Sequence, residues 1–96
     1  MELARMINTF IKNAEKDPRL SPSHISVFIA LIFQWERIGQ VKRFRVFSYE
    51  VMPMAKVSSR STYFKCVGDL NDAGYLRYQP SKYKHEASSI EFIGLE

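Results

Sequence analysis

The stretch from Val57 to Leu76, VSSRSTYFKCVGDLNDAGYL, constrains the fold more than any other part of the sequence. Ser58 or Ser59 is placed to cap a helix, because a serine side chain accepts a hydrogen bond from a free amide of the first helical turn. Gly74 is suited to the left-handed conformation that ends helices. Between these signals, apolar residues recur at helical spacing, at Tyr63, Cys66, Val67 and Leu70. The stretch predicts a helix with one buried face, a polar and basic leading end, and an abrupt stop before a strand.

Two earlier segments also carry helical patterns. Residues 1–17 predict an amphipathic helix, whose apolar stripe contains Leu3, Met6, Ile7, Phe10, Ile11 and Ala14. Residues 22–38 predict a second helix, with Ser21 or Ser23 as its cap and Gly39 at its stop. This second helix is apolar on most sides, so it should lie at the centre of the molecule with neighbours on two faces.

The segment KRFRVFS, at 42–48, alternates basic and apolar residues and predicts a short strand. Ser48 is a possible cap for a brief helix through Lys56. Pro53 leaves two possibilities open: this helix is kinked, or its regular part begins at Pro53 itself. Further on, YLRYQPS and SSIEFIG each alternate over part of their length, with the polar KYKHEA between them. They predict a β-hairpin with a basic tip.

Composition limits the number of domains. The 96 residues, 46% of them hydrophobic and 14% aromatic, suffice for one compact core and hardly for two, so a single domain over 1–96 is expected. The one cysteine, Cys66, predicts no disulfide framework and is most simply a small buried residue. The start of the chain has no secretory pattern, and the longest apolar run, 27–33, is too short to cross a bilayer. A cytoplasmic protein with no membrane partner is expected.

The net charge of +4 is distributed unevenly along the chain. Residues 37–65 hold seven basic residues and one acidic residue, Glu50, whereas 1–36 are balanced and 66–96 are acidic. A local basic field suits a polyanion, and nucleic acid is the partner that it indicates. The alternative is a solvated face that keeps the protein soluble.

The order helix, helix, strand, helix, turn, helix, hairpin resembles the winged helix-turn-helix domain. The similarity is carried by MAKVSSRSTYFKCVGDLNDAGYL, with a short helix ending at Ala55-Lys56, a Ser-Arg-Ser-Thr opening and an Ala-Gly-aromatic-Leu exit. It extends over roughly residues 20–94. The chain is similar to regulators of the multiple-antibiotic-resistance type and to amino-terminal domains of replication initiators. It is also similar to small winged-helix proteins of bacterial conjugative and other mobile elements.

The resemblance implies an α+β fold, mainly helical, with an additional amino-terminal helix over 1–17, a central helix over 22–38, a helix-turn-helix over 48–74 and a wing hairpin over 75–94. It also implies that the last helix of the motif reads duplex DNA in the major groove while the wing holds the backbone. The DNA-binding residues that it indicates are Ser59, Arg60, Ser61, Thr62, Phe64 and Lys65 on the helix, and Lys82, Lys84 and His85 at the wing tip.

Two of these positions have a structural alternative. Phe64 either touches a thymine methyl or a sugar, or packs against a neighbouring helix, and packing is favoured. Lys65 is either a DNA contact or an ordinary exposed lysine.

The sequence contains no pattern typical of an enzyme. His24 and His85 are far apart in the chain and have no cysteine pair near them, so no zinc site is indicated. The glycines are isolated, and the serines near position 59 have no evident base and read as helix caps. We expect no catalytic residue, no metal and no cofactor.

Two functions remain. The first is duplex DNA binding, as a transcriptional regulator or as a replication or transfer accessory factor. The second is a winged helix that binds other proteins in a replication or transfer complex. A homodimer is expected, because the apolar stripe of the first helix offers a surface that the core helices need not cover; the alternative is that this stripe folds back onto Val27, Leu31 and Ile38.

Overall fold

The computed structural model describes residues 2–81 and 87–94. The elements in this part of the chain are α1 (Glu2–Glu15), α2 (Pro22–Arg37), β1 (Arg43–Val46), α3 (Ser48–Ala55), α4 (Arg60–Asp72), β2 (Leu76–Gln79) and β3 (Ser88–Phe92). The expected order of elements is confirmed, and so is the mainly helical α+β class. The first helix ends at Glu15, earlier than expected, and a turn with Pro18 and Arg19 at its centre follows, closed by a hydrogen bond from the Leu20 N–H to the Asp17 carbonyl.

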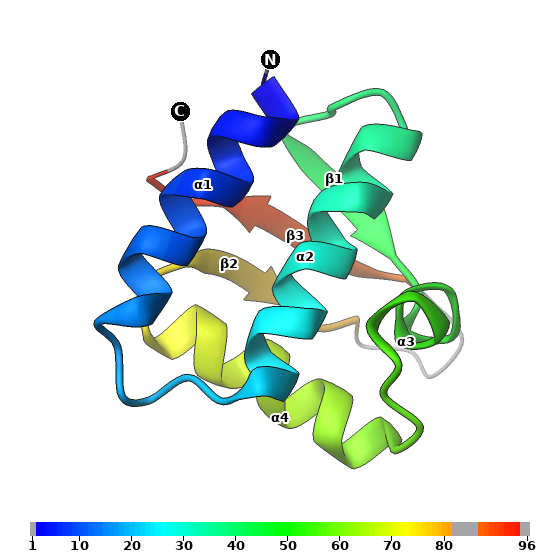
Figure 1. The fold of residues 1–96 in the computed structure, drawn as a ribbon. Coiled ribbons are helices and arrows are strands. Elements are labelled where there is room, and N and C mark those ends of the chain that lie inside the picture. The colour runs from blue at the N-terminus through cyan, green and yellow to red at the C-terminus, as the bar shows by residue number, and fades with distance from the viewer. Residues whose placement is uncertain (1, 82–86, 95–96) are drawn as a thin grey trace.

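The three strands form one antiparallel sheet in the order β1-β3-β2. The hairpin of β2 and β3 is confirmed, and β1 pairs with the other side of β3. Glu91 on the central strand β3 lies opposite Arg43 on β1 and opposite Arg77 on β2. Figure 1 shows α1 and α2 lying across one face of the sheet, with α4 below and α3 at one side. The sheet therefore has an inner face toward the helices and an outer face away from them.

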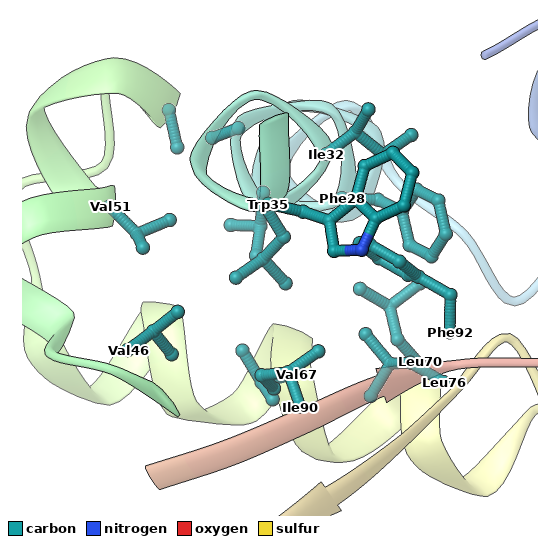
Figure 2. Close-up of a cluster of buried hydrophobic side chains, with 14 of the residues drawn as sticks. Phe28, Ile32, Trp35, Val46, Val51, Val67, Leu70, Leu76, Ile90 and Phe92 are labelled. Carbon is teal, nitrogen blue, oxygen red and sulfur yellow. The ribbon is translucent and has the colours of Figure 1, made fainter. Parts of the chain in front are cut away.

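The core lies between α2 and the inner face of the sheet. Figure 2 shows side chains of α2, α3, α4 and the strands converging on it, among them Phe28, Ile32, Val51, Val67, Leu70 and Ile90. All six of these side chains are fully buried. Within the apolar run 27–33, five residues are buried, Ile29 is partly buried, and Phe33 is 44% exposed. The central position expected of the second helix is confirmed.

Helix α1 uses its apolar stripe to close the core. Met6 and Phe10 are buried, and the ring of Phe10 stacks on that of Phe28 with 3.9 Å between the centroids. Leu3, Ile7 and Ile11 pack partly buried against the same cluster. The stripe thus folds back onto its own chain, so it is not the free surface on which the expected homodimer rested. Ile38, which was expected to take part in this packing, is 39% exposed.

The helix ends follow the signals in the sequence. Ser21 is the N-cap of α2, and Ser59 is the N-cap of α4. Gly39 and Gly74, with φ of 94° and 87°, adopt the left-handed conformation just after α2 and α4. Glycine has no Cβ to clash in this region, which is why these two positions stop their helices.

Helix α3 corrects one expectation, the cap at Ser48, and decides between the two possibilities left open for Pro53. It begins at Ser48 and has Phe47 as its N-cap, so Ser48 is the first helical residue and not the cap. Pro53 lies inside the helix, not at its start, because the three residues after Ser48 and before Met52 are already helical. The helix ends at Ala55, and its C-cap Lys56 is a non-glycine residue in the left-handed conformation with φ of 58°.

None of the helices in residues 2–81 and 87–94 is long and apolar enough to span a membrane.

Candidate nucleic-acid interface

Helix α4 separates its side chains into two faces. Tyr63, Cys66, Val67 and Leu70 are buried in the core, as expected from their spacing. Arg60, Ser61 and Lys65 are exposed on the other side, in the first half of the helix. This half carries two cations and no acidic residue, whereas Asp69 and Asp72 belong to the second half. The positive end of the helix dipole and the basic side chains therefore coincide.

The start of α4 is held by its own serine cap. The hydroxyl of Ser59 accepts a hydrogen bond from the backbone N–H of Thr62 at 3.3 Å and lies 2.9 Å from the hydroxyl of Ser61. Of the two serines proposed as the cap, Ser59 is therefore correct. A capping serine contributes about 1 kcal/mol to stability. Ser59, one of the residues expected to contact DNA, therefore also stabilises the start of the helix. Thr62 is partly buried, and its amide serves the cap.

Arg60 is positioned by an aromatic neighbour on the same helix. Its guanidinium carbon lies 5.7 Å from the centre of the Phe64 ring, a cation–π distance. Phe64 in turn meets Tyr63 edge-on, with 5.1 Å between the centroids, and is partly buried against the core. Phe64 therefore packs against the core cluster, and its ring also contacts the exposed arginine.

Lys65 is tied to the second half of the helix. Its Nζ donates to Oδ2 of Asp69 at 3.0 Å, while 72% of its side chain remains exposed. The same carboxylate oxygen lies 2.8 Å from Nε2 of His24 on α2. These two hydrogen bonds, that of His24 first, lower the pKa of Asp69. Asp69 thus joins the exposed lysine to the central helix.

His24 is buried, with 7% of its surface exposed, and both of its ring nitrogens are engaged. Nδ1 accepts the backbone N–H of Ser21 at 2.9 Å and lies 2.7 Å from the hydroxyl of Ser21. Because Nδ1 is an acceptor, Nε2 carries the hydrogen and donates it to Asp69. A chain of hydrogen bonds therefore connects the cap of α2 to Asp69 on α4.

An open hollow of about 620 Å³ lies beside the start of α4. Its lining comes from α3, from the connection 56–59 and from α4, and consists of Ser48, Tyr49, Met52, Pro53, Lys56, Val57, Ser58 and Arg60. Lys56 and Arg60 give it two cations, and both are exposed. The left-handed backbone at Lys56 turns the chain sharply here, so that α3 and the start of α4 border the same depression.

The structure thus brings Arg60 together with residues that the sequence did not assign to a site. Lys56 counted only toward the basic segment, and Tyr49 and Ser58 had no assigned contact. One feature of the sequence could have identified Tyr49 as a site residue, since it is an aromatic residue on the polar side of a short helix. In the structure, Tyr49 is 68% exposed. Lys82, Lys84 and His85, the expected wing-tip contacts, lie outside the described residues.

Comparison of the chain with protein-family models, with curated protein sequences and with solved structures gave no match. Within residues 2–81 and 87–94, no group of three or more His, Cys, Asp or Glu side chains is placed to hold a metal ion.

Proposed function

We propose that this protein is a winged helix-turn-helix domain that binds duplex DNA. Helix α4 serves as the recognition helix, α3 precedes it in the motif, and the hairpin of β2 and β3 forms the wing. The process served is transcriptional regulation, or replication or transfer as an accessory factor. No catalytic step and no cofactor belong to this proposal, and a DNA-binding role fits the cytoplasmic location expected from the sequence.

The observation that carries the proposal is the division of α4. Its apolar face is locked in the core, while Arg60, Ser61 and Lys65 stand exposed at its leading end beside a hollow that adds Lys56. An α-helix fits the major groove, and arginine holds guanine through two hydrogen bonds. The cation–π contact with Phe64 limits the conformations that Arg60 adopts, which lowers the entropy lost when it binds a base.

A second candidate function is supported by the wall of the hollow. Tyr49, Met52 and Val57 give it an apolar lining next to its two cations. Such a surface also suits a peptide segment of another protein, as in a replication or transfer complex. The absence of duplex binding would favour this second function.

The assembly that we propose is a pair of copies on a two-fold duplex site. Helix-turn-helix proteins bind half-sites about one helical turn apart. Because the apolar stripe of α1 is covered by its own chain, the DNA site, and not this stripe, would bring two copies together.

The test is selection from a random pool of duplexes, followed by titration of the wild type and the Arg60→Ala variant at two salt concentrations. We expect an enriched sequence, and a loss of about 1–3 kcal/mol for Arg60→Ala with relaxed preference at one position. The Lys82→Ala, Lys84→Ala double variant should weaken binding to all sequences alike. It should also reduce the salt slope by about one for each lost phosphate contact.

Arg37→Ala is the matched control, since this exposed arginine at the end of α2 lies outside the hollow and α4. Its affinity should stay close to that of the wild type. Failure of the wild type to bind any duplex at low salt, where attraction is least screened, would contradict the proposal. Binding without an enriched sequence would leave only general DNA binding.

A further inference from the structure

The outer face of the sheet is basic. Along β1 the exposed residues are Arg43 and Arg45, which alternate with the buried Phe44 and Val46. On β2, Arg77 and Gln79 are exposed in the same alternation. Since side chains of neighbouring strands in register share a face, these residues stand together on the side away from the core.

The register arranges this face in two rows across the strands. One row is Arg43, Glu91 and Arg77, and the other is Arg45, Ser89 and Gln79. Both arginines of the first row lie 3.6 Å from the same oxygen, Oε1 of Glu91, and each remains more than 60% exposed. Among these six residues a single carboxylate therefore faces three guanidinium groups, which leaves a net positive surface.

An aromatic pair, Phe47 and Tyr49, follows the end of β1 in the chain, and Tyr49 also lines the hollow beside α4. The rings of Phe47 and Tyr49 stack with 5.1 Å between centroids and 27° between their planes. Tyr49 is 68% exposed, so one face of its ring is open. Exposed aromatic rings beside a positively charged track are the combination by which proteins hold single strands, because every base has a face that can stack.

We propose that the outer face of the sheet binds single-stranded nucleic acid without sequence preference, with Tyr49 stacking on a base and Arg43, Arg45 and Arg77 holding phosphates. This face is formed by strands and presents no helix to a duplex groove. Arg43 and Arg45 are two residues apart on a strand, about 7 Å, a spacing comparable to that of neighbouring phosphates in an extended strand. None of these three arginines belongs to α4 or to the hollow, whereas Tyr49 also lines the hollow. The arginine variants, and not those of Tyr49, therefore separate this inference from the proposed function.

A fluorescent oligothymidylate of about 20 nucleotides tests the inference by anisotropy at two salt concentrations. Arg45→Ala with Arg77→Ala should weaken its binding about ten-fold at low salt and lower the salt slope by about 1.4, that is, about 0.7 for each lost phosphate contact. Glu91→Gln should act in the opposite sense and strengthen binding about two- to three-fold, because it removes the only carboxylate of the two rows. Tyr49→Ala should cost about five-fold or more, while Tyr49→Phe keeps the ring and should bind like the wild type.

The matched control is Lys12→Ala with Arg37→Ala, which removes two exposed cations from α1 and α2. Its affinity should remain within about two-fold of the wild type. An equal loss in this control, or no binding of the oligothymidylate by the wild type at low salt, would overturn the inference. So would normal binding by the folded Arg45→Ala, Arg77→Ala variant, since these charges would then serve only to keep the strand edges from aggregating.

A duplex titrated in parallel separates this inference from the proposed function. Arg60→Ala should weaken the duplex alone, and Arg45→Ala with Arg77→Ala should weaken the single strand alone. An equal effect of the sheet variant on both ligands would make the outer face part of the duplex footprint and would contradict a single-strand site.

Discussion

Asp17 shows how a residue in a connection acquires its role from partners elsewhere. The segment Asp-Pro-Arg in the sequence indicates only where the first helix stops. In the structure the Asp17 carboxylate accepts hydrogen bonds from the guanidinium and the backbone N–H of Arg19, and from the hydroxyl of Tyr75 at 2.8 Å. These contacts, that of the Arg19 side chain first, hold the pKa of Asp17 well below its ordinary range. The carboxylate thus fastens the α1–α2 connection to the start of the hairpin.

The Asp17→Asn variant should be less stable than the wild type at neutral pH. A carboxylate with a depressed pKa in the folded state stabilises the fold above its unfolded pKa, about 3.9, and loses this contribution as the pH falls toward the folded value. The difference in unfolding free energy between the two proteins should therefore be largest at pH 7 and shrink below about pH 4. Urea denaturation at pH 7 and pH 3 measures it.

Tyr75→Phe is the companion variant, because it removes one donor to the carboxylate and leaves Arg19 in place. Tyr75→Phe should also lower the free energy of unfolding at pH 7, by a smaller amount than Asp17→Asn. An Asp17→Asn deficit that does not change with pH would show that the charge of Asp17 has no part in it.

At the scale of elements, α4 combines a capped start, a glycine in its middle and a glycine stop. Gly68 lies in the middle of α4, where a glycine can allow another helix to approach closely. A Cβ built at Gly68 meets no atom within 4 Å, so no neighbour requires glycine here. Gly74 has equally open surroundings, but its φ of 87° is a conformation that other residues rarely adopt. The two glycines therefore differ in backbone conformation and not in space.

Gly68→Ala should stabilise the protein by about 0.5–1 kcal/mol, since alanine loses less backbone entropy in a helix and finds free space. Gly74→Ala is the matched variant and should destabilise the protein by about 1 kcal/mol or more, because of its left-handed backbone. Urea denaturation gives both changes in stability from the shift of the midpoint, provided that the dependence of the unfolding free energy on urea concentration is unchanged. A destabilised Gly68→Ala would mean that the surroundings of α4 are tighter than the structure shows.

The whole molecule is closed by its first helix. The rings of Phe10, Phe28 and Tyr75 meet where α1, α2 and the start of the hairpin come together, with Phe10 and Tyr75 edge-on at 5.5 Å. The apolar stripe of α1 is therefore buried or partly buried against the core of its own chain. We therefore expect any pairing of two copies to use other surfaces.

The free protein should accordingly sediment as a monomer at micromolar concentration, and two copies should assemble on a duplex that carries two half-sites. Mass action explains the difference, since each bound copy adds its own phosphate contacts to one DNA molecule. Sedimentation measures the number of protein copies in each sample. It should be carried out on the protein alone, on its mixture with a duplex that carries one half-site, and on its mixture with a duplex that carries two. A stable dimer without DNA would contradict this prediction, and one copy on the two-half-site duplex would contradict the proposed assembly.

The sequence by itself determined the elements and most of their ends. Spacing identified the buried face of α4. The stop residues Gly39 and Gly74 act through backbone groups only a few residues away, and so does the cap of α4, for which the sequence offered Ser58 or Ser59 and the structure shows Ser59. Local hydrogen bonding and periodicity are properties of a short segment, so they can be read without the fold. The same holds for Arg60 and Lys65, whose exposure follows from the helical period.

Only the tertiary structure decided which elements meet. Several features bring together residues from different elements. The apolar stripe of α1 is covered by the core, and β1 pairs with β3. His24 is hydrogen-bonded to Asp69, and the hollow places Lys56 and Tyr49 beside Arg60. Even Pro53 depends on context, because it lies within α3, a helix that packs Val51 and Ala55 into the core. Such contacts arise from the packing of whole faces and the register of strands, which no single segment of the chain contains.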